Sequence, residues 1–497
     1  MGLSTAQMDR AAGVLLGQAA GDALGVPYEF GTPPGPDEPA LMTGGGLING
    51  APGEWSDDTA MAVAVAQAAV RHRDLASPEG LSDVARGFLT WYAGRPADIG
   101  IQTRAVLSAV ADRANDPGIG HRMHEAAAVY ARRNPRSAGN GALMRTAPVA
   151  LASLTDREQA ARAARAVAEL THADPLAGDS CVLWSEAIRV AVLDGRIEVD
   201  AGLDLLPGGR RDTWSGLIHD ARTRPPSTFR PNGYTVTALQ AAVAAVTQTE
   251  VPTLDPSHHR FPCQHLQDAL HAAVRIGDDT DTVAAIAGGL LGARWGASAV
   301  PWRWRRLVHG WPGLLSRGLQ AFGTSIVAHE PGTGWEEAPA MDYPHLANEG
   351  VVPHPYDDGV LLGTMGALDH GASAIVSLCR VGTDEPLFGG TPPQDRIESR
   401  LIDSSDASQN ANLHFLLYDA ADAVRGLRDE GHMVLLHCVA AHQRTPSVAL
   451  AYAALLGHDA TGAAARIQAE LPSTRGHGSV WDAAKELCPS PASDGAP

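Results

Sequence analysis

The chain has 497 residues, a formal net charge of −18, 44% hydrophobic residues and 19% charged residues. This length exceeds what one hydrophobic core supports and predicts about two to four domains, with the composition of a globular protein. The negative charge argues against a surface that binds nucleic acid without specificity.

The sequence shows neither a targeting signal nor cysteines at paired spacings. No apolar run reaches the length of a membrane span, and the N-terminus lacks a basic and then apolar signal, so we expect a cytoplasmic protein without membrane partners. The five cysteines are scattered and indicate neither a disulfide framework nor a zinc site. Lys485 is the only lysine, which excludes any other lysine for a Schiff base or a Walker-type phosphate loop.

The first predicted helix covers residues 10–25 and carries Gly13, Gly17 and Gly21 at a four-residue interval. Such a stripe of small residues allows another helix to approach closely. A loop rich in Gly and Pro follows to about residue 54, and Glu29 opens it. An ordinary solvated carboxylate is the plain interpretation of Glu29.

Two acidic runs far apart in the sequence, 56–59 and 277–282, each precede a run of small apolar residues. Both predict turns that open onto buried helices, with Asp and Thr at the first helical positions. Helix capping is one interpretation, but it needs only one acceptor per helix. At least four half-buried carboxylates repel one another unless cations lie among them, and hard oxygen ligands select Mg²⁺ or Mn²⁺. We therefore predict a metal site, provided that the two runs meet in space.

From residue 59 to about residue 325 nearly every segment is predicted to be helical, which indicates an all-α bundle. The predicted helices cover 81–93, 101–113, 156–171, 179–194, 235–248, 264–275 and 302–322. Gly139, Asn140 and Gly141 precede a helix and can receive phosphate, although a simple turn is the more frequent outcome. His172 ends another helix and is either a ligand contact or a C-terminal cap.

Five motifs in order resemble those of the ADP-ribosylglycohydrolase family over about residues 8–325. They are Gly21-Asp22-Ala23-Leu24-Gly25, Ser56-Asp57-Asp58-Thr59, Gly139-Asn140-Gly141-Ala142-Leu143-Met144-Arg145, Thr171-His172-Ala173 and Gly277-Asp278-Asp279-Thr280-Asp281-Thr282. The resemblance implies an all-α domain that holds two Mg²⁺ ions, with Mn²⁺ as the alternative metal. It places the metal ligands at Ser56, Asp57, Asp58, Asp279, Asp281 and Thr282, and Glu29 on a mobile loop over them.

The chemistry of such a site is consistent with these residue types. Cleavage at the anomeric carbon of ribose passes through an oxocarbenium-like state. Two cations can fix the neighbouring ribose hydroxyls and lower the pKa of a bound water. Glu29 or Asp58 then serves as acid or base. Backbone donors near Gly139, Asn140 and Gly141 can hold the diphosphate.

Beyond residue 325 the pattern changes, and we divide the chain into a helical domain over 1–325, a linker over 326–349, an α/β domain over 350–487 and a disordered tail over 488–497. In the α/β domain, strands at 374–378 and 433–437 alternate with helices at 411–428 and 446–457.

The second of these strands runs directly into Cys438, with Arg444 six residues later and Pro446 at the start of a helix. A phosphate cradle needs this arrangement, because loop N–H groups and a helix N-terminus surround the anion while the arginine binds it. The same positive field would make Cys438 a thiolate near neutral pH. A buried structural cysteine with a chance arginine is the alternative.

This stretch resembles the protein-tyrosine and dual-specificity phosphatases over about residues 350–485. The resemblance makes Cys438 the nucleophile, Arg444 the phosphate ligand and Thr445 the hydroxyl that assists turnover. It makes Asp406 the general acid, with Asp403 as second choice. Ala441 departs from the family, which usually has Gly there, and a positive φ would strain it by roughly 1 kcal/mol or more.

We expect a hydrolase that removes ADP-ribose from a modified protein or small molecule, joined to a phosphatase that acts on a phosphorylated substrate. One alternative is a binding module in which one or both domains are inactive. Another is a structural helical protein, since the glycohydrolase family includes a lens crystallin.

Overall fold

The structure, a computed structural model, describes residues 2–328, 343, 346 and 350–488. They form two units, which are described separately: 2–250, 265–300 and 307–328 make the first, and 251–264, 301–306 and the described residues from 343 onward make the second. Most of the linker predicted over 326–349 lies outside the described residues, as does the tail predicted over 488–497 apart from Cys488.

The first unit is helical. Its longer helices are α1 (Thr5–Gly25), α2 (Asp57–Arg71), α3 (Pro78–Ala93), α4 (Ile101–Ser108), α5 (Ile119–Arg133), α6 (Ala147–Ala152), α7 (Arg157–Glu169), α8 (Pro175–Asp194), α9 (Gly208–Thr223), α10 (Thr235–Gln248), α11 (His265–Ile276), α12 (Thr280–Trp295) and α14 (Ser316–Ala328). The helix predicted over 302–322 is wrong. The chain there forms α13 (Trp302–Leu307), a hairpin of β1 (His309–Gly310) and β2 (Leu314–Leu315), and then α14. Pro312 lacks a backbone N–H and Gly313 has a φ of 103°, and both break a helix.

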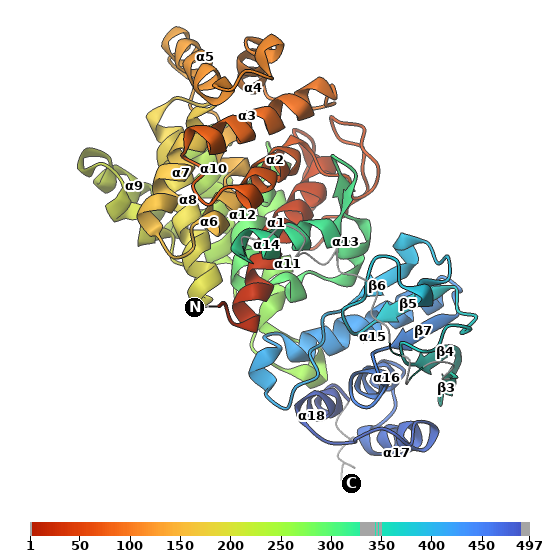
Figure 1. Cartoon of the computed structure of the whole chain (residues 1–497). Helices are drawn as coiled ribbons and strands as arrows, with labels where there is room; N and C mark the ends of the chain where they lie inside the picture. Colours follow the sequence, from red (N-terminus) through yellow and green to blue (C-terminus); the bar gives the residue numbers. More distant parts are fainter. Residues whose placement is uncertain (1, 329–342, 344–345, 347–349, 489–497) are drawn as a thin grey trace. The chain divides into compact units, whose positions relative to one another are not determined.

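Helices α1 and α12 pack against each other at the centre of the first unit (Figure 1). The contact is unusually close because glycines line it on both sides. A Cβ atom added to Gly17 would overlap the carbonyl oxygen of Gly288, and one added to Gly21 would overlap that of Ala284. The glycine stripe expected to admit another helix therefore faces α12. Nearly every residue of α12 is buried, which fits its run of small apolar side chains.

The second unit is a small α/β domain, as predicted. Its sheet has the order β3 (Val352–His354), β4 (Asp357–Gly363), β7 (Val434–His437), β5 (Ala374–Ser377) and β6 (Arg396–Glu398), with only the β3–β4 pair antiparallel. Its helices after residue 350 are α15 (Leu413–Asp429), α16 (Arg444–Leu455), α17 (Ala460–Glu470) and α18 (Ser479–Glu486), of which α15 and α16 contact the central strands and α17 contacts β3. The strands β5 and β7 were predicted, whereas β3, β4 and β6 were not.

Two short segments of the helical half of the sequence, 251–264 and 301–306, belong to this second unit. The backbone N–H of Trp302 donates to Asp419 at 2.8 Å, and its indole N–H donates to Asp422 at 2.8 Å. Arg305 forms a buried ion pair with Asp419 at 3.0 Å. Helix α15 therefore packs on chain that precedes it by more than a hundred residues.

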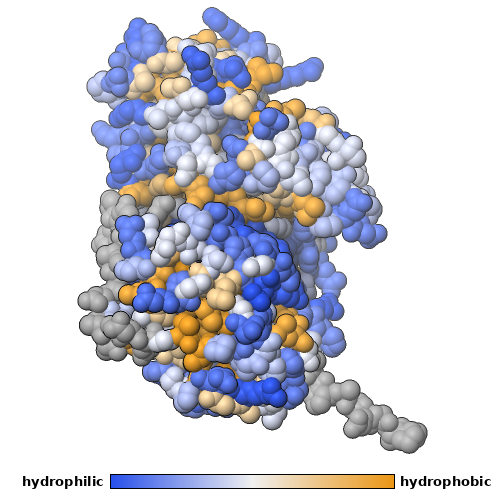
Figure 2. Space-filling view, turned by 90° about the vertical axis from the view of Figure 1, so that its right-hand side faces the viewer, coloured by the Kyte–Doolittle hydropathy of each residue, from blue (hydrophilic) through white to orange (hydrophobic). Residues whose placement is uncertain are grey.

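The surface matches the composition. On the face that Figure 2 draws, hydrophilic side chains cover much of the surface and hydrophobic ones form smaller groups. Among the helices in the described part of the chain, none has both the length and the apolar character of a membrane span.

The close packing of α1 on α12 gives a stability prediction. We expect Gly17→Ala to lower the free energy of unfolding by roughly 2 kcal/mol, because the new methyl group forces the helices apart. Gly216→Ala is the matched control, since a Cβ on this glycine of α9 meets nothing within 4 Å. The control should be neutral or stabilising by up to about 1 kcal/mol. Urea unfolding followed by circular dichroism measures both, and equal effects would contradict the close contact.

Candidate functional site

Carboxylates from three helix ends meet in the first unit. Asp22 lies in the last turn of α1, Asp58 in the first turn of α2, and Asp281 in the first turn of α12. The packing of α1 on α12 brings Asp22 and Asp281 together, because Gly25 lies directly against the backbone of Asp281. The Thr280 hydroxyl fastens the junction by donating to the carbonyl of Gly25 at 2.8 Å.

The acidic groups form two adjoining clusters. One oxygen each from Asp22, Asp58 and Asp281 lies within 4.8 Å of the other two, and one oxygen each from Glu29, Asp279 and Asp281 satisfies the same condition. Asp281 belongs to both clusters. The two acidic runs of the sequence, which are more than two hundred residues apart, therefore meet in space.

Burial makes this concentration of charge costly. Desolvation and the neighbouring carboxylates raise the pKa of Glu29 to about 8 and hold those of Asp58 and Asp281 well above the usual range. Within the described residues, Asp58 Oδ1 and Glu29 Oε2 are buried oxygens without a hydrogen-bond partner. Such orphaned oxygens among crowded carboxylates are what hard divalent cations bind, so this donor set fits Mg²⁺ or Mn²⁺.

Asp22 organises the first acidic run, a role that its sequence motif alone does not indicate. Its two carboxylate oxygens accept hydrogen bonds from the backbone N–H groups of Ser56 and Thr59, both at 2.9 Å. The Ser56 hydroxyl in turn donates to Asp58 Oδ2 at 2.9 Å and accepts from the backbone N–H of Asp58. Ser56 therefore caps α2 and orients Asp58, and the capping interpretation also holds for this run.

Asn232 organises the second acidic run and was not predicted. Its backbone N–H donates to Asp278 Oδ2, and its side-chain oxygen accepts from the N–H of Asp279, both at 2.9 Å. These bonds hold Asp278 at a φ of 71°. Asn140 Nδ2 donates to Asp279 Oδ2 at 2.8 Å, so the predicted phosphate loop touches a predicted metal ligand. Thr282 lies beside Asp279, to which its side chain is hydrogen-bonded.

Asp57 lies next to the two clusters and borders a small cavity. Burial is the main cause that raises the pKa of Asp57, and the negative charge of Asp98 is the next. Asp98 is therefore a further acidic neighbour, which was not predicted. Both carboxylates line a cavity of about 130 Å³ together with Trp55, Trp91 and Trp311. A cavity with two acids and aromatic walls suits a planar cation.

The loop at 139–141 and His172 lie against each other. A Cβ atom on Gly139 would come within 3.4 Å of His172 Nε2, and one on Gly141 would come within 2.9 Å of its Cε1. The glycines thus make room for the imidazole. His172 is buried, and burial together with the Arg145 charge lowers its pKa to about 3. It is therefore a neutral group in the interior.

In the second unit, Cys438 directly follows β7 and α16 begins at Arg444. Ala441 has a φ of 52°, so the residue that replaces the expected glycine does adopt the left-handed conformation. Arg444 donates to the carbonyls of Leu378 and Leu401 at 3.3 and 3.2 Å. Within the described residues, Arg444 Nε and Thr445 Oγ1 are buried without a hydrogen-bond partner.

The two candidate general acids lie on one exposed loop. Asp406 is exposed, and its carboxylate accepts hydrogen bonds from the N–H and hydroxyl of Ser408. Asp403 lies 4.0 Å from Arg475, whose backbone N–H donates to the carbonyl of His442 in the cysteine loop. Asp403 is thus connected to the cysteine loop through Arg475. Asp406, in contrast, caps the short helix that follows it.

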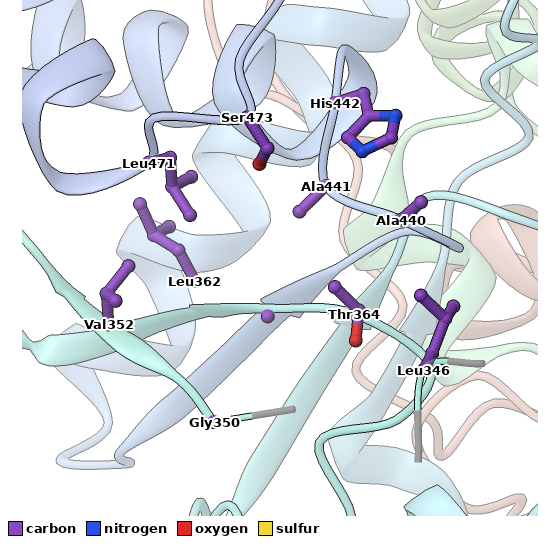
Figure 3. Close-up of a pocket in the computed structure, with 11 residues that line it drawn as sticks. Leu346, Gly350, Val352, Leu362, Thr364, Ala440, Ala441, His442, Leu471 and Ser473 are labelled. Atoms are coloured by element: carbon purple, nitrogen blue, oxygen red, sulfur yellow. The ribbon is translucent and has the colours of Figure 1, made fainter. Parts of the chain in front are cut away.

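A pocket of about 360 Å³ opens beside the cysteine loop (Figure 3). Ala440, Ala441 and His442 form one side of it. Leu362, Leu471 and Val352 give the pocket an apolar wall. Its position next to the loop makes it a candidate subsite for an apolar group.

Comparison with known proteins adds independent information on the helical part of the sequence. The family model of the ADP-ribosylglycohydrolases matches residues 3–331, which is more than half of the chain. The chain is 30% identical to the ADP-ribosylarginine hydrolase Tri1 of Pseudomonas putida over 307 residues, 60% of this chain and 73% of that protein. It is 29% identical to the ADP-ribosyl-[dinitrogen reductase] glycohydrolase of Rhodospirillum rubrum over 310 residues, 60% of this chain and 89% of that protein.

A solved structure described as an ADP-ribosylglycohydrolase-related protein complex matches with a TM-score of 0.48 and 27% identity, covering 65% of this chain and 98% of that one. The matched region 3–331 holds all the acidic residues of the two clusters. Because the family model matches more than half of its residues, the chain belongs to the ADP-ribosylglycohydrolase family.

Proposed function

We propose that this protein hydrolyses the glycosidic bond between ADP-ribose and an acceptor, with the two acidic clusters as its active site. The observation that carries the proposal is the meeting of Asp22, Asp58 and Asp281 with Glu29 and Asp279. Capping does not account for buried carboxylates whose oxygens lack partners. A binding module that does not cut ADP-ribose is the alternative that the experiments below address.

We propose that Asp22, Asp58, Asp279 and Asp281 hold two divalent cations, with Ser56, Asp57 and Thr282 close by. When bound, the cations supply positive charge that holds ribose hydroxyls and makes water a better nucleophile. The residues themselves keep this site ready, because Asp22 and Asn232 accept hydrogen bonds from backbone N–H groups of the two acidic runs, and the Ser56 hydroxyl donates to the Asp58 carboxylate. Glu29 is only partly buried, so it is placed to exchange a proton with the reacting groups.

The diphosphate is assigned to the loop at 139–141. Gly139 and Gly141 have no side chain between the loop backbone and His172, and the loop begins the short helix Asn140–Arg145. Asn140 touches Asp279, so the phosphate loop and the metal ligands are neighbours. ADP-ribose bound there would place its distal ribose at the acidic clusters.

For the acceptor we propose an arginine guanidinium. The cavity lined by Asp57 and Asp98 has carboxylates to pair with the cation, and tryptophans among its other lining residues suit a planar cation. The Pseudomonas putida relative is named as an ADP-ribosylarginine hydrolase, which is consistent with this acceptor.

For the second unit we propose a cysteine-dependent phosphatase. The observation that favours it is the placement of Cys438 at the end of β7, with unpaired Arg444 Nε and Thr445 Oγ1 next to it. Loop N–H groups and the start of α16 would bind the phosphate dianion, Cys438 would attack phosphorus as the P–O bond to the leaving group breaks, and water would then hydrolyse the phosphocysteine. Asp403 or Asp406 would protonate the leaving group.

If the clusters bind metal, the order of stability of the wild type and an Asp281→Asn variant should reverse when Mg²⁺ is added. In chelator, Asp281→Asn should melt at a higher temperature than the wild type, because it removes a charge from both clusters. With Mg²⁺ at about 100 times its dissociation constant, the wild type should gain roughly 2.7 kcal/mol and the variant much less. Thermal unfolding with and without MgCl₂ measures this, and Asp212→Asn on exposed α9 serves as control. Equal Mg²⁺ gains in variant and wild type would refute the site.

The acceptor assignment predicts a selective effect of Asp98→Asn. Loss of one charge-assisted hydrogen bond should lower kcat/KM on ADP-ribosylarginine peptide by roughly 10- to 100-fold. Hydrolysis of ADP-ribosylserine peptide, which lacks the guanidinium, should change far less. A proportional loss on both peptides would show that Asp98 serves the common chemistry instead.

The phosphatase proposal predicts that Cys438→Ser abolishes hydrolysis of p-nitrophenyl phosphate, with a loss on the order of 10³-fold or more. The glycohydrolase activity of the same variant should be unchanged. Cys488→Ser is the matched control, because that thiol is buried elsewhere in the second unit. A wild-type enzyme without phosphatase activity but with measurable phosphopeptide binding would favour the binding module.

A further inference from the structure

We infer that Arg145, Thr171 and His172 form a hydrogen-bond relay that keeps the proton of the His172 imidazole on Nε2, where it donates to an oxygen of the ligand bound against Gly139 and Gly141. The inference rests on the proposed ADP-ribose site and deepens it. His172 is the contact residue, and Arg145 and Thr171 are positioning residues that act through it.

The relay begins at Arg145, which is completely buried. Its Nη2 donates to the hydroxyl of Thr171 at 2.6 Å, and its Nη1 donates to the carbonyl of Gly141 at 3.0 Å. The guanidinium also lies 4.5 Å from the ring centroid of Phe88, a cation–π contact that helps to keep the charge in the interior. Arg145 thus holds both the phosphate loop and Thr171.

The direction of the hydrogen bonds follows from the inventory of donors. A guanidinium can only donate, so Thr171 Oγ1 is the acceptor from Arg145. The same oxygen lies 2.8 Å from His172 Nδ1. In the described part of the chain, the hydroxyl has no other partner, so its single proton goes to Nδ1. Nδ1 is therefore an acceptor without a proton.

The charge state of the ring completes the assignment. Burial, and to a smaller extent the positive charge of Arg145, lowers the pKa of His172 to about 3, so the ring is uncharged at neutral pH. An uncharged imidazole carries one proton, and with Nδ1 unprotonated this proton lies on Nε2.

Nε2 lies against the phosphate loop. A Cβ atom on Gly139 would lie 3.4 Å from Nε2 and one on Gly141 would lie 3.2 Å from it, so the two glycines let the loop backbone come close to this nitrogen. Nε2 makes no hydrogen bond to another described residue. A donor with a fixed proton and no charge recognises an acceptor oxygen, which the diphosphate and ribose of ADP-ribose both provide.

The tautomer can be measured on the full-length protein. Long-range ¹H–¹⁵N correlation with ¹⁵N-histidine, assigned by the signal that His172→Gln removes, should show an Nε2-protonated ring with unprotonated Nδ1. Thr171→Val removes the hydroxyl and should shift or broaden this signal, and Thr171→Ser should restore it. Thr247→Val is the control, because its hydroxyl only bonds the carbonyl of Val243 within α10. An Nδ1-protonated or charged ring in the wild type overturns the relay.

Binding of ADP-ribose gives the second readout. Thr171→Val should weaken ADP-ribose affinity roughly tenfold in calorimetry, the equivalent of about 1.4 kcal/mol, and Thr171→Ser should restore most of it. Unchanged affinity in a variant whose tautomer has changed overturns the contact with the ligand. If the wild type does not bind ADP-ribose, the proposed function fails by itself, and the spectrum alone decides the relay.

Discussion

The close contact of α1 with α12 is the constraint on which the proposed active site depends. Both helices are buried, and glycine on each side lets one backbone lie against the carbonyls of the other. This proximity carries Asp22 of α1 to Asp281 of α12, and it seats Gly25 on the first turn of α12. A wider spacing between the helices would expose and separate the carboxylates, and so reduce both the desolvation and the mutual repulsion that raise the pKa values of Glu29, Asp58 and Asp281. The tight helix contact therefore also determines the electrostatics of the site, because it gathers carboxylates that either take up protons or bind cations.

Three of the carboxylates, those of Asp22, Asp58 and Asp279, are oriented by groups that do not themselves belong to the clusters. Ser56 and Thr59 bond Asp22 through their backbones, while Asn232 bonds the turn before α12. Asn140 then connects that turn to the phosphate loop, and Arg145 connects the loop to His172 through Thr171. The ligand-facing groups are thus held by hydrogen bonds within the fold, which is the condition for a site that does not reorganise when substrate binds.

Local chemistry allowed much of this to be predicted. Acidic residues before runs of small apolar residues indicated buried helix starts, and the structure places Asp57, Asp58 and Asp281 in first turns. The apolar strands predicted the α/β character of residues 350–487, but edge strands as short as β6 have too few residues to show a strand pattern. Asp22 and Asn232 escaped because their roles depend on tertiary contacts: one lies within a helix, and the other lies more than forty residues before the turn that it holds. The hairpin at 309–315 interrupted a helical pattern at Pro312.

The segments 251–264 and 301–306 give the chain an interleaved organisation. The sequence pattern suggests two domains that follow one another along the chain. In the structure, however, Asp419 and Asp422 of α15 bond Trp302 and Arg305 from the helical part of the sequence. A C-terminal fragment expressed from residue 350 would keep Asp419 in an apolar interior without its arginine, and an unpaired buried carboxylate is strongly unfavourable. The α/β unit is therefore not contained in the last third of the sequence: a cut made at the boundary that the sequence suggests would remove part of its own polar interior.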